Sequence, residues 1–315
     1  MTQLPRGGLS SGRTAPAAPD DASATRRDPT GPAPAAFLVL AGASLFGTIG
    51  TARVLGPDSP SGSVGAVRVL LAAVVLVVLA SAARPQAGAW RREWRRPSTV
   101  GAGAAQAAFQ LTFLAAVLQT GVAVGTLVAI GSAPLVAGLL SRQVSRTWLL
   151  ATSVALAGLV LLVLGGGGAR LSWAGLLLAL GAGTSYGVYL VTTSRAVTAG
   201  APPALTTAVA FTVAAVVLMP WLALSDAGWL GTGSGWLMVV YLALVPTVLA
   251  YRLFARGLRS VPASTASTMA LAEPVVATVL GVALLDERLS AVGWLGAALV
   301  LTGLVLVSRR PTATM

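Results

Sequence analysis

Ten apolar segments, each about as long as the roughly 20 residues that a helix needs to cross a bilayer, follow one another along the chain. Backbone polar groups in lipid must be satisfied within the protein, which favours helices. Only 10% of the residues are charged, whereas a soluble domain carries about a quarter. We therefore predict an all-α integral membrane protein with ten transmembrane helices. The predicted spans are 35–54, 63–83, 99–118, 122–141, 147–165, 172–194, 203–224, 235–256, 262–284 and 290–308.

The residue types that are missing from the chain exclude several classes of function. All 21 basic residues are Arg, and the sequence has no Lys, His or Cys. This excludes P-loop and Schiff-base lysines, Ser-His triads, disulfides and metal sites with His or Cys ligands. The net charge of +12 comes from Arg residues between the apolar segments, so we expect no nucleic-acid partner. We also expect no catalytic residue, no metal and no cofactor.

The distribution of Arg predicts how the chain is oriented. Cytoplasmic loops retain more Lys and Arg than loops on the other side of the membrane. With both termini inside, sixteen Arg residues are cytoplasmic and three, Arg53, Arg170 and Arg288, are outside. We therefore expect a multi-pass protein of the plasma (inner) membrane with cytoplasmic tails at 1–34 and 309–315. The first tail is rich in Pro, Ala, Ser and Thr, a composition typical of disorder.

The second half of the chain resembles the first. When the sequence is aligned with itself so that Gly47 falls on Gly187, Pro134 falls on Pro274. With a small gap, the alignment continues and places Gly158 on Gly303, each followed by Leu-Val-Leu. Apolar sequences match by chance, so the aligned Pro residue carries more weight than the aliphatic ones. We interpret the pattern as an internal duplication.

The duplication predicts two repeats of five helices, over residues 35–165 and 172–308. Five crossings are an odd number, so the second repeat enters the membrane from the opposite side. The two repeats are therefore predicted to be inverted relative to each other. Inverted repeats recur in secondary transporters, where they form a site near the midplane that either side can open.

Residues 271–290, with the sequence LAEPVVATVLGVALLDERLS, carry the strongest family resemblance. They are similar to a stretch of the EamA group in the drug/metabolite transporter superfamily, although Asp286 stands where Gly is usual. Arg68, the segment 241–251 and the segment 293–296 also match, and the resemblance covers residues 35–308. It implies transport of small metabolites, amino acids or drugs, commonly outward and without ATP. It also implies a central cavity between helices 1 to 4 and 6 to 9, with helices 5 and 10 peripheral.

The first half departs from this family pattern. After Pro134 it continues to Ser141 and Arg142 over a shorter stretch than expected, and it lacks the expected Glu. Functional symmetry between the two halves is therefore in doubt.

Three residues within the predicted spans are the sharpest candidates for function. Glu273 lies about twelve residues into span 262–284, near the bilayer centre, where an ionised carboxylate costs several kcal/mol. It is either a proton acceptor or counter-charge for substrate, or a protonated group bonded to a neighbouring helix. Pro274 frees a backbone carbonyl one turn earlier, which makes either a ligand contact and hinge or a simple kink. Arg68 either snorkels to the headgroups or points inward as an anion clamp.

A further set of polar and amphipathic side chains lies within apolar spans. Each can line a cavity or serve as a hydrogen-bonding contact between helices. We expect some of the set to line the pathway. The set is Gln106, Gln110, Tyr186, Tyr189, Tyr241 and Tyr251.

Together these observations predict a secondary active exporter that works by alternating access, with proton exchange at Glu273. The expected partners are a small-molecule substrate and the lipid bilayer, with a homodimer left open. Two alternatives remain: a membrane scaffold or sensor without flux, and an intramembrane lipid-modifying enzyme. The enzyme is disfavoured because such catalysts usually need clustered Asp, His or Cys.

Overall fold

The computed structural model describes residues 32–166 and 172–308, and these ranges fold into helices without any strand. Ten helical segments are long and apolar enough to cross a membrane, which confirms the predicted all-α membrane fold with ten spans. They are Ala33–Leu55, Ser61–Ala82, Pro97–Gly121, Val124–Ser141, Arg146–Gly165, Trp173–Thr198, Pro203–Ala223, Gly233–Gly257, Ala263–Leu284 and Ala291–Ser308. Almost all of the predicted tails, 1–31 and 309–315, lies outside the described residues.

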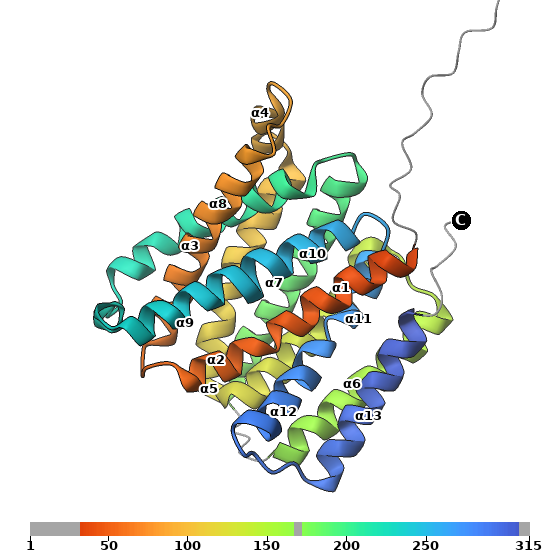
Figure 1. Cartoon of the computed structure of the whole chain (residues 1–315). Coiled ribbons are helices and arrows are strands. Elements are labelled where there is room, and N and C mark those ends of the chain that lie inside the picture. The colour runs from red at the N-terminus through yellow and green to blue at the C-terminus, as the bar shows by residue number, and fades with distance from the viewer. Residues whose placement is uncertain (1–31, 167–171, 309–315) are drawn as a thin grey trace, which may run out of the picture.

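Several spans are built from more than one helix, and one helix contains two spans (Figure 1). The elements of the first half are α1 (Pro32–Phe46), α2 (Thr48–Leu55), α3 (Ser61–Ala82), α4 (Ala89–Trp94), α5 (Pro97–Ser141) and α6 (Arg146–Gly166). Those of the second half are α7 (Trp173–Thr198), α8 (Pro203–Ala223), η1 (Gly228–Gly231), α9 (Gly233–Ala243), η2 (Leu244–Leu249), α10 (Ala250–Gly257), α11 (Ala263–Met269), α12 (Ala272–Leu284) and α13 (Ala291–Ser308).

The third and fourth spans are joined at Gly121 within α5. Gly121 has φ 79° and ψ 165°, a conformation that favours glycine. A Cβ placed on Gly125 would lie 3.3 Å from the Cα atom of Val117, whereas eight residues of straight helix extend about 12 Å. The chain therefore reverses here, and the two spans form a tight helical hairpin.

The eighth span contains a wide turn around Pro246. Proline has no N–H, so Pro246 cannot donate to the carbonyl of Leu242 four residues earlier. The backbone widens into the π-helix η2, and the Thr247 Oγ1 hydroxyl donates to the Leu242 carbonyl at 2.8 Å. The side chain therefore satisfies the backbone group that the proline leaves without its usual partner.

The ninth span is broken just before Pro274. The helix α11 ends at Met269 and α12 begins at Ala272. In the break, the N–H of Glu273 donates to the Ala270 carbonyl at 3.0 Å. This carbonyl, which Pro274 would otherwise leave without a helical partner, is thus bonded by the residue before the proline.

The helices α6 and α13 pack on each other at one edge of the bundle (Figure 1). A Cβ on Gly158 would lie 2.6 Å from the carbonyl oxygen of Gly296, and a Cβ on Gly303 would lie 2.7 Å from that of Ala151. Small residues let helix backbones approach this closely in a membrane.

Candidate functional site

A hydrogen bond between Gln106 and Tyr251 joins the two halves of the chain in the middle of the bundle. Gln106 on α5 donates from Nε2 to the hydroxyl of Tyr251 on α10 at 3.1 Å. The side chain of Gln106 is 1% exposed, and its Oε1 has no hydrogen-bond partner among the described residues. A buried acceptor without a partner is unfavourable by about 1–3 kcal/mol, so this oxygen is a contact that a ligand or water can complete.

Tyr251 belongs to a group of aromatic rings that includes two further predicted tyrosines. Its ring centroid lies 5.6 Å from that of Tyr189, which lies 6.2 Å from that of Tyr186. On its other sides, Tyr251 contacts Phe46 at 4.9 Å and Phe211 at 4.7 Å. Three candidate tyrosines from α7 and α10 are therefore brought together.

The aromatic group continues into the first half through two phenylalanines. Phe109 lies 5.3 Å from Tyr186 and 5.4 Å from Phe113, measured between ring centroids. Sequence reasoning missed both as site residues, as it missed Phe46 and Phe211. Phe109 and Phe113 are spaced four residues apart on one helix and share a face with Gln106, which is the signal that could have found them.

Arg68 and Glu273 supply opposite charges to the same region. Arg68 on α3 lies within electrostatic range of Glu273 at the start of α12 and of Tyr251, but no ion pair joins Arg68 and Glu273 in the described ranges. The charge of Glu273 also acts on Tyr186. The Nε atom of Arg68 is buried and has no hydrogen-bond partner among the described residues. Burial of the Nε atom favours the inward orientation of Arg68, which stays a prediction.

Glu273 sits where two interrupted spans meet. A Cβ on Gly47, at the junction of α1 and α2, would lie 2.6 Å from the carbonyl oxygen of Glu273. The Glu273 side chain is only half-buried, and ionisable groups inside a membrane face the bundle interior or a hydrated space. The backbone of Glu273 is therefore fixed by the contact with Gly47, while its side chain remains partly exposed.

A second glycine contact resembles that of Gly47. A Cβ on Gly187 of α7 would lie 3.1 Å from the carbonyl oxygen of Ala133 and 2.8 Å from Cγ1 of Val136. Ala133 precedes Pro134, as Glu273 precedes Pro274, but α5 continues through Pro134 without a break. In both contacts a glycine packs against the carbonyl of the residue before a proline, but at Ala133 that residue carries no charge.

Two of the predicted residues lie apart from these contacts. Tyr241 packs against a cluster that includes Val64, Trp229 and Met238. Gln110 is half-buried on α5, one turn after Gln106 and on the same face. The roles of these two residues, like those of the rest of the set, stay predictions.

Comparison with known proteins places the chain in a family. Residues 173–309 match the EamA-like transporter family. Over 281 residues the chain is 39% identical to the uncharacterized transporter YwfM of Bacillus subtilis strain 168, and the match covers 87% of this chain and 94% of YwfM. The chain belongs to the EamA-like transporter family. The resemblance predicted from residues 271–290 is thereby confirmed, and the chain is a multi-pass membrane transporter.

Two further comparisons agree with this assignment. The uncharacterized inner membrane transporter YedA of Escherichia coli strain K12 is 30% identical over 161 residues, which is 50% of this chain and 51% of YedA. A protein of known crystal structure aligns with a TM-score of 0.75 at 21% identity, over 89% of this chain and 99% of that one. At this identity the alignment establishes a shared fold alone.

Proposed function

We propose that this transporter is a secondary active exporter of small organic molecules that exchanges a proton at Glu273 as it alternates between inward-open and outward-open states. The observation that carries the proposal is the carboxylate of Glu273, which lies mid-span beside a helix break and within electrostatic range of Arg68. Ionisable residues at this depth mark substrate and proton pathways.

The proposed mechanism uses the two protonation states of Glu273. When ionised, the carboxylate is attracted to Arg68 across the bundle. The ionised carboxylate also offers a negative charge to a cationic group of a substrate, and protonation removes that charge, so a proton and the substrate compete for Glu273. The two states make different contacts, and a ligand can shift a conformational equilibrium only through such a difference. A proton taken up from outside releases the substrate there, and loss of the proton to the inside frees the carboxylate for the next substrate, so proton entry drives the substrate outward.

We further propose that residues 35–165 and 172–308 form two inverted repeats. Gly187 follows Gly47 at the same interval along the chain as Glu273 follows Ala133. The alignment of the halves therefore pairs Gly47 with Gly187 and Glu273 with Ala133. Gly47 packs against Glu273, and Gly187 packs against Ala133, so the two contacts correspond. This correspondence supports a two-fold relation between the repeats.

The contact between α6 and α13 supports the same relation. Gly303 follows Gly158 at the same interval as Gly296 follows Ala151. The alignment therefore pairs Gly158 with Gly303 and Gly296 with Ala151. The contact of Gly158 with Gly296 thus corresponds to the contact of Gly303 with Ala151. Symmetric packing of this pair is consistent with a frame around which the other spans move.

The first experiment identifies a substrate. Extracellular and intracellular metabolites are compared between cells that express the protein and cells that do not. We expect at least one small metabolite to accumulate outside expressing cells. A protein that serves as a scaffold or sensor leaves both pools unchanged.

The second experiment tests the role of Glu273 with the metabolite found in this way. In proteoliposomes with an imposed pH gradient, we expect Glu273→Gln to reduce gradient-driven flux to the level of empty liposomes. Asp286→Asn is the matched control, because Asp286 is an exposed carboxylate beyond the end of α12 and Asn tolerates its positive φ of 55°. Undiminished gradient-driven flux in Glu273→Gln refutes proton exchange at this residue.

The proposed orientation, with both termini cytoplasmic in the plasma (inner) membrane, is tested by labelling. The chain has no Cys, so a single Cys can be introduced at each loop without background. We expect Cys at Arg142 to react with an impermeant maleimide only from the cytoplasmic side, and Cys at Asp226 only from outside. Labelling of both from one side contradicts the ten-span topology.

A further inference from the structure

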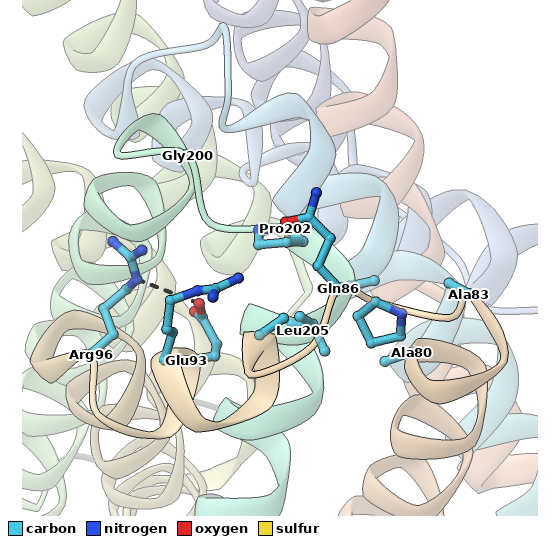
Figure 2. A pocket seen from close by; sticks show the side chains of 12 residues that line it. Ala80, Ala83, Gln86, Glu93, Arg96, Gly200, Pro202 and Leu205 are labelled. Atoms are coloured by element: carbon cyan, nitrogen blue, oxygen red, sulfur yellow. Dashed lines mark ion pairs between the residues drawn. The ribbon is translucent and has the colours of Figure 1, made fainter.

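A pocket with four polar side chains lies at one end of the bundle, between residues other than those of the candidate site (Figure 2). It has a volume of about 300 Å³ and is bounded by the end of α3, by α4 and by the turn between α7 and α8. The transport mechanism proposed above does not use it. Its polar lining consists of Gln86, Arg92, Glu93 and Arg96.

Glu93 is the buried anchor of this pocket. Its side chain is 2% exposed, and its Oε1 accepts hydrogen bonds from the hydroxyls of Thr99 and, at 2.9 Å, of Thr206. Its Oε2 lies 3.4 Å from the Nε atom of Arg96, the ion pair drawn in Figure 2. The carboxylate is thus already satisfied by the protein. It holds Arg96 in place and does not offer itself to a cation.

The pocket retains cationic and amide donors that the protein does not satisfy. Arg92 is exposed, and the only hydrogen bond of its side chain among the described residues is a long one, 3.5 Å from Nη1 to the Ala87 carbonyl. Arg96 uses Nε toward Glu93 and keeps its terminal amino groups, and Gln86 adds an amide. Planar guanidinium groups bind phosphate through paired hydrogen bonds. The pocket therefore has the chemistry of a phosphate site with a net positive charge.

The pocket lies at the basic end of the bundle. Among the described residues, the order of the helices places ten Arg and one acidic residue, Glu93, at this end of the bundle. It places four carboxylates at the other end. The ten are Arg84, Arg91, Arg92, Arg95, Arg96, Arg142, Arg146, Arg195, Arg256 and Arg259, and the four are Asp58, Asp226, Asp286 and Glu287. This asymmetry attracts anions to the end that carries α4.

The surroundings of the pocket match the headgroup layer of a membrane. The helix α4 carries Trp90 and Trp94, and the ring of Trp94 is 43% exposed. Trp side chains prefer the membrane–water interface. On the last turns of α3, next to the pocket, Val78 is 59% exposed and Leu79 is 40% exposed. An apolar surface therefore leads from the lipid to the polar pocket.

We propose that this pocket binds the phosphate headgroup of an anionic phospholipid from the leaflet at the Arg-rich end, with Arg92 and Arg96 as the phosphate ligands and the acyl chains along α3. Because the pocket is bounded by α3 and α4 of one half and by the α7–α8 turn of the other, the lipid spans both halves. The Glu93–Thr206 hydrogen bond already joins the same two halves beneath it.

The test compares lipid retention by the full-length protein in nanodiscs of phosphatidylcholine with and without phosphatidylglycerol, measured by native mass spectrometry. We expect preferential retention of phosphatidylglycerol, and we expect Arg92→Gln to weaken it on the order of tenfold, the size of one charge-assisted hydrogen bond. Arg91→Gln is the matched control, since Arg91 is an exposed residue of the same helix that does not line the pocket. It removes the same charge, and we expect a change of less than about twofold because exposed charges are screened by salt.

Three outcomes overturn the proposal. Equal losses in Arg91→Gln and Arg92→Gln indicate diffuse surface charge and no built site. Undiminished retention in Arg92→Gln removes this residue as a ligand. If inorganic phosphate raises the melting temperature in pure phosphatidylcholine nanodiscs and displaces phosphatidylglycerol, the site takes a soluble phosphate and the lipid assignment fails. Melting temperatures of both variants, measured in parallel, verify that each is folded.

Discussion

The segments around Pro134 and Pro274, which the proposed repeat aligns with each other, differ in structure and charge. Each has a glycine of the other half packed against the residue before its proline. In the second half this residue is Glu273 and the helix breaks, whereas in the first it is Ala133 and α5 continues. The same glycine contact therefore occurs at a charged, interrupted span in the second half and at a neutral, continuous span in the first half.

The positive charge of Arg68 is present in the first half and absent from the second. Arg68 belongs to the first half, and the alignment that puts Pro134 on Pro274 puts Arg68 on Ala208, which is fully buried in α8. Each half thus contributes one charge where its counterpart has alanine. The site is assembled from two unlike halves, and neither half contains both charges.

The largest expected effect comes from moving the acid to the other half. In the double variant Glu273→Ala with Ala133→Glu, we expect gradient-driven flux in proteoliposomes to stay at the level of empty liposomes. The new carboxylate would face the α7 side, where Ala208 replaces Arg68 as the related residue. Recovery of flux would mean that the halves are interchangeable, against the asymmetry described above.

A smaller effect is expected on stability when one charge is removed. Arg68→Gln leaves Glu273 without a cation in electrostatic range, and an unbalanced carboxylate near the bilayer centre is unfavourable by roughly 3 kcal/mol. Adding Glu273→Gln removes the stranded charge, so we expect the double variant to regain about 1 kcal/mol or more. Thermal unfolding in detergent measures all four proteins of this double-mutant cycle. Strictly additive losses would show that the two charges do not interact.

The two glycine contacts are expected to differ in tolerance. In Gly47→Ala the new methyl group meets the Glu273 carbonyl at 2.6 Å, and overpacking of this kind destabilises by about 1–3 kcal/mol. In Gly187→Ala the corresponding carbonyl, that of Ala133, lies farther away at 3.1 Å, so we expect a smaller loss. Melting temperatures of the two variants give the comparison. A larger drop for Gly187→Ala would contradict it.

The smallest effect concerns the hydrogen bond that joins the halves. Tyr251→Phe removes the acceptor for Gln106, and we expect a loss of about 1 kcal/mol in unfolding free energy. Tyr241→Phe is the matched control, because the Tyr241 hydroxyl has no hydrogen bond within 32–166 and 172–308. Equal melting temperatures for the two variants would remove this bond from the contacts that hold the halves together.

The ten spans could be predicted from the sequence because apolar length is set by bilayer thickness. The seventh span, predicted as 203–224, is Pro203–Ala223 in the structure. The π-turn at Pro246 was not predicted, since it depends on whether Thr247 reaches the Leu242 carbonyl. The length and spacing of apolar residues do not predict a hydrogen bond from a side chain to the backbone.

The candidate site was predictable as a set of residues but not as an arrangement. Polar groups in apolar spans point inward as a rule, and this rule selected Arg68, Gln106 and Glu273 as candidates. Which of them meet depends on how each helix is rotated by packing at small residues such as Gly47. Glu93 was missed because a charge run of mostly Arg resembles a solvated surface, and its burial requires the distant hydroxyl of Thr206.

The Thr247 hydroxyl gives the eighth span an unusual chemical requirement. Valine has nearly the same shape, yet it would leave a bare carbonyl in a dehydrated interior. Serine would keep the donor but lose the methyl group that fixes the rotamer. Position 247 therefore accepts neither of the two closest replacements freely, although it neither carries charge nor touches Arg68 or Glu273 in any interaction described above. The Thr247 hydroxyl thus gives this span a polar requirement that comes from its own backbone.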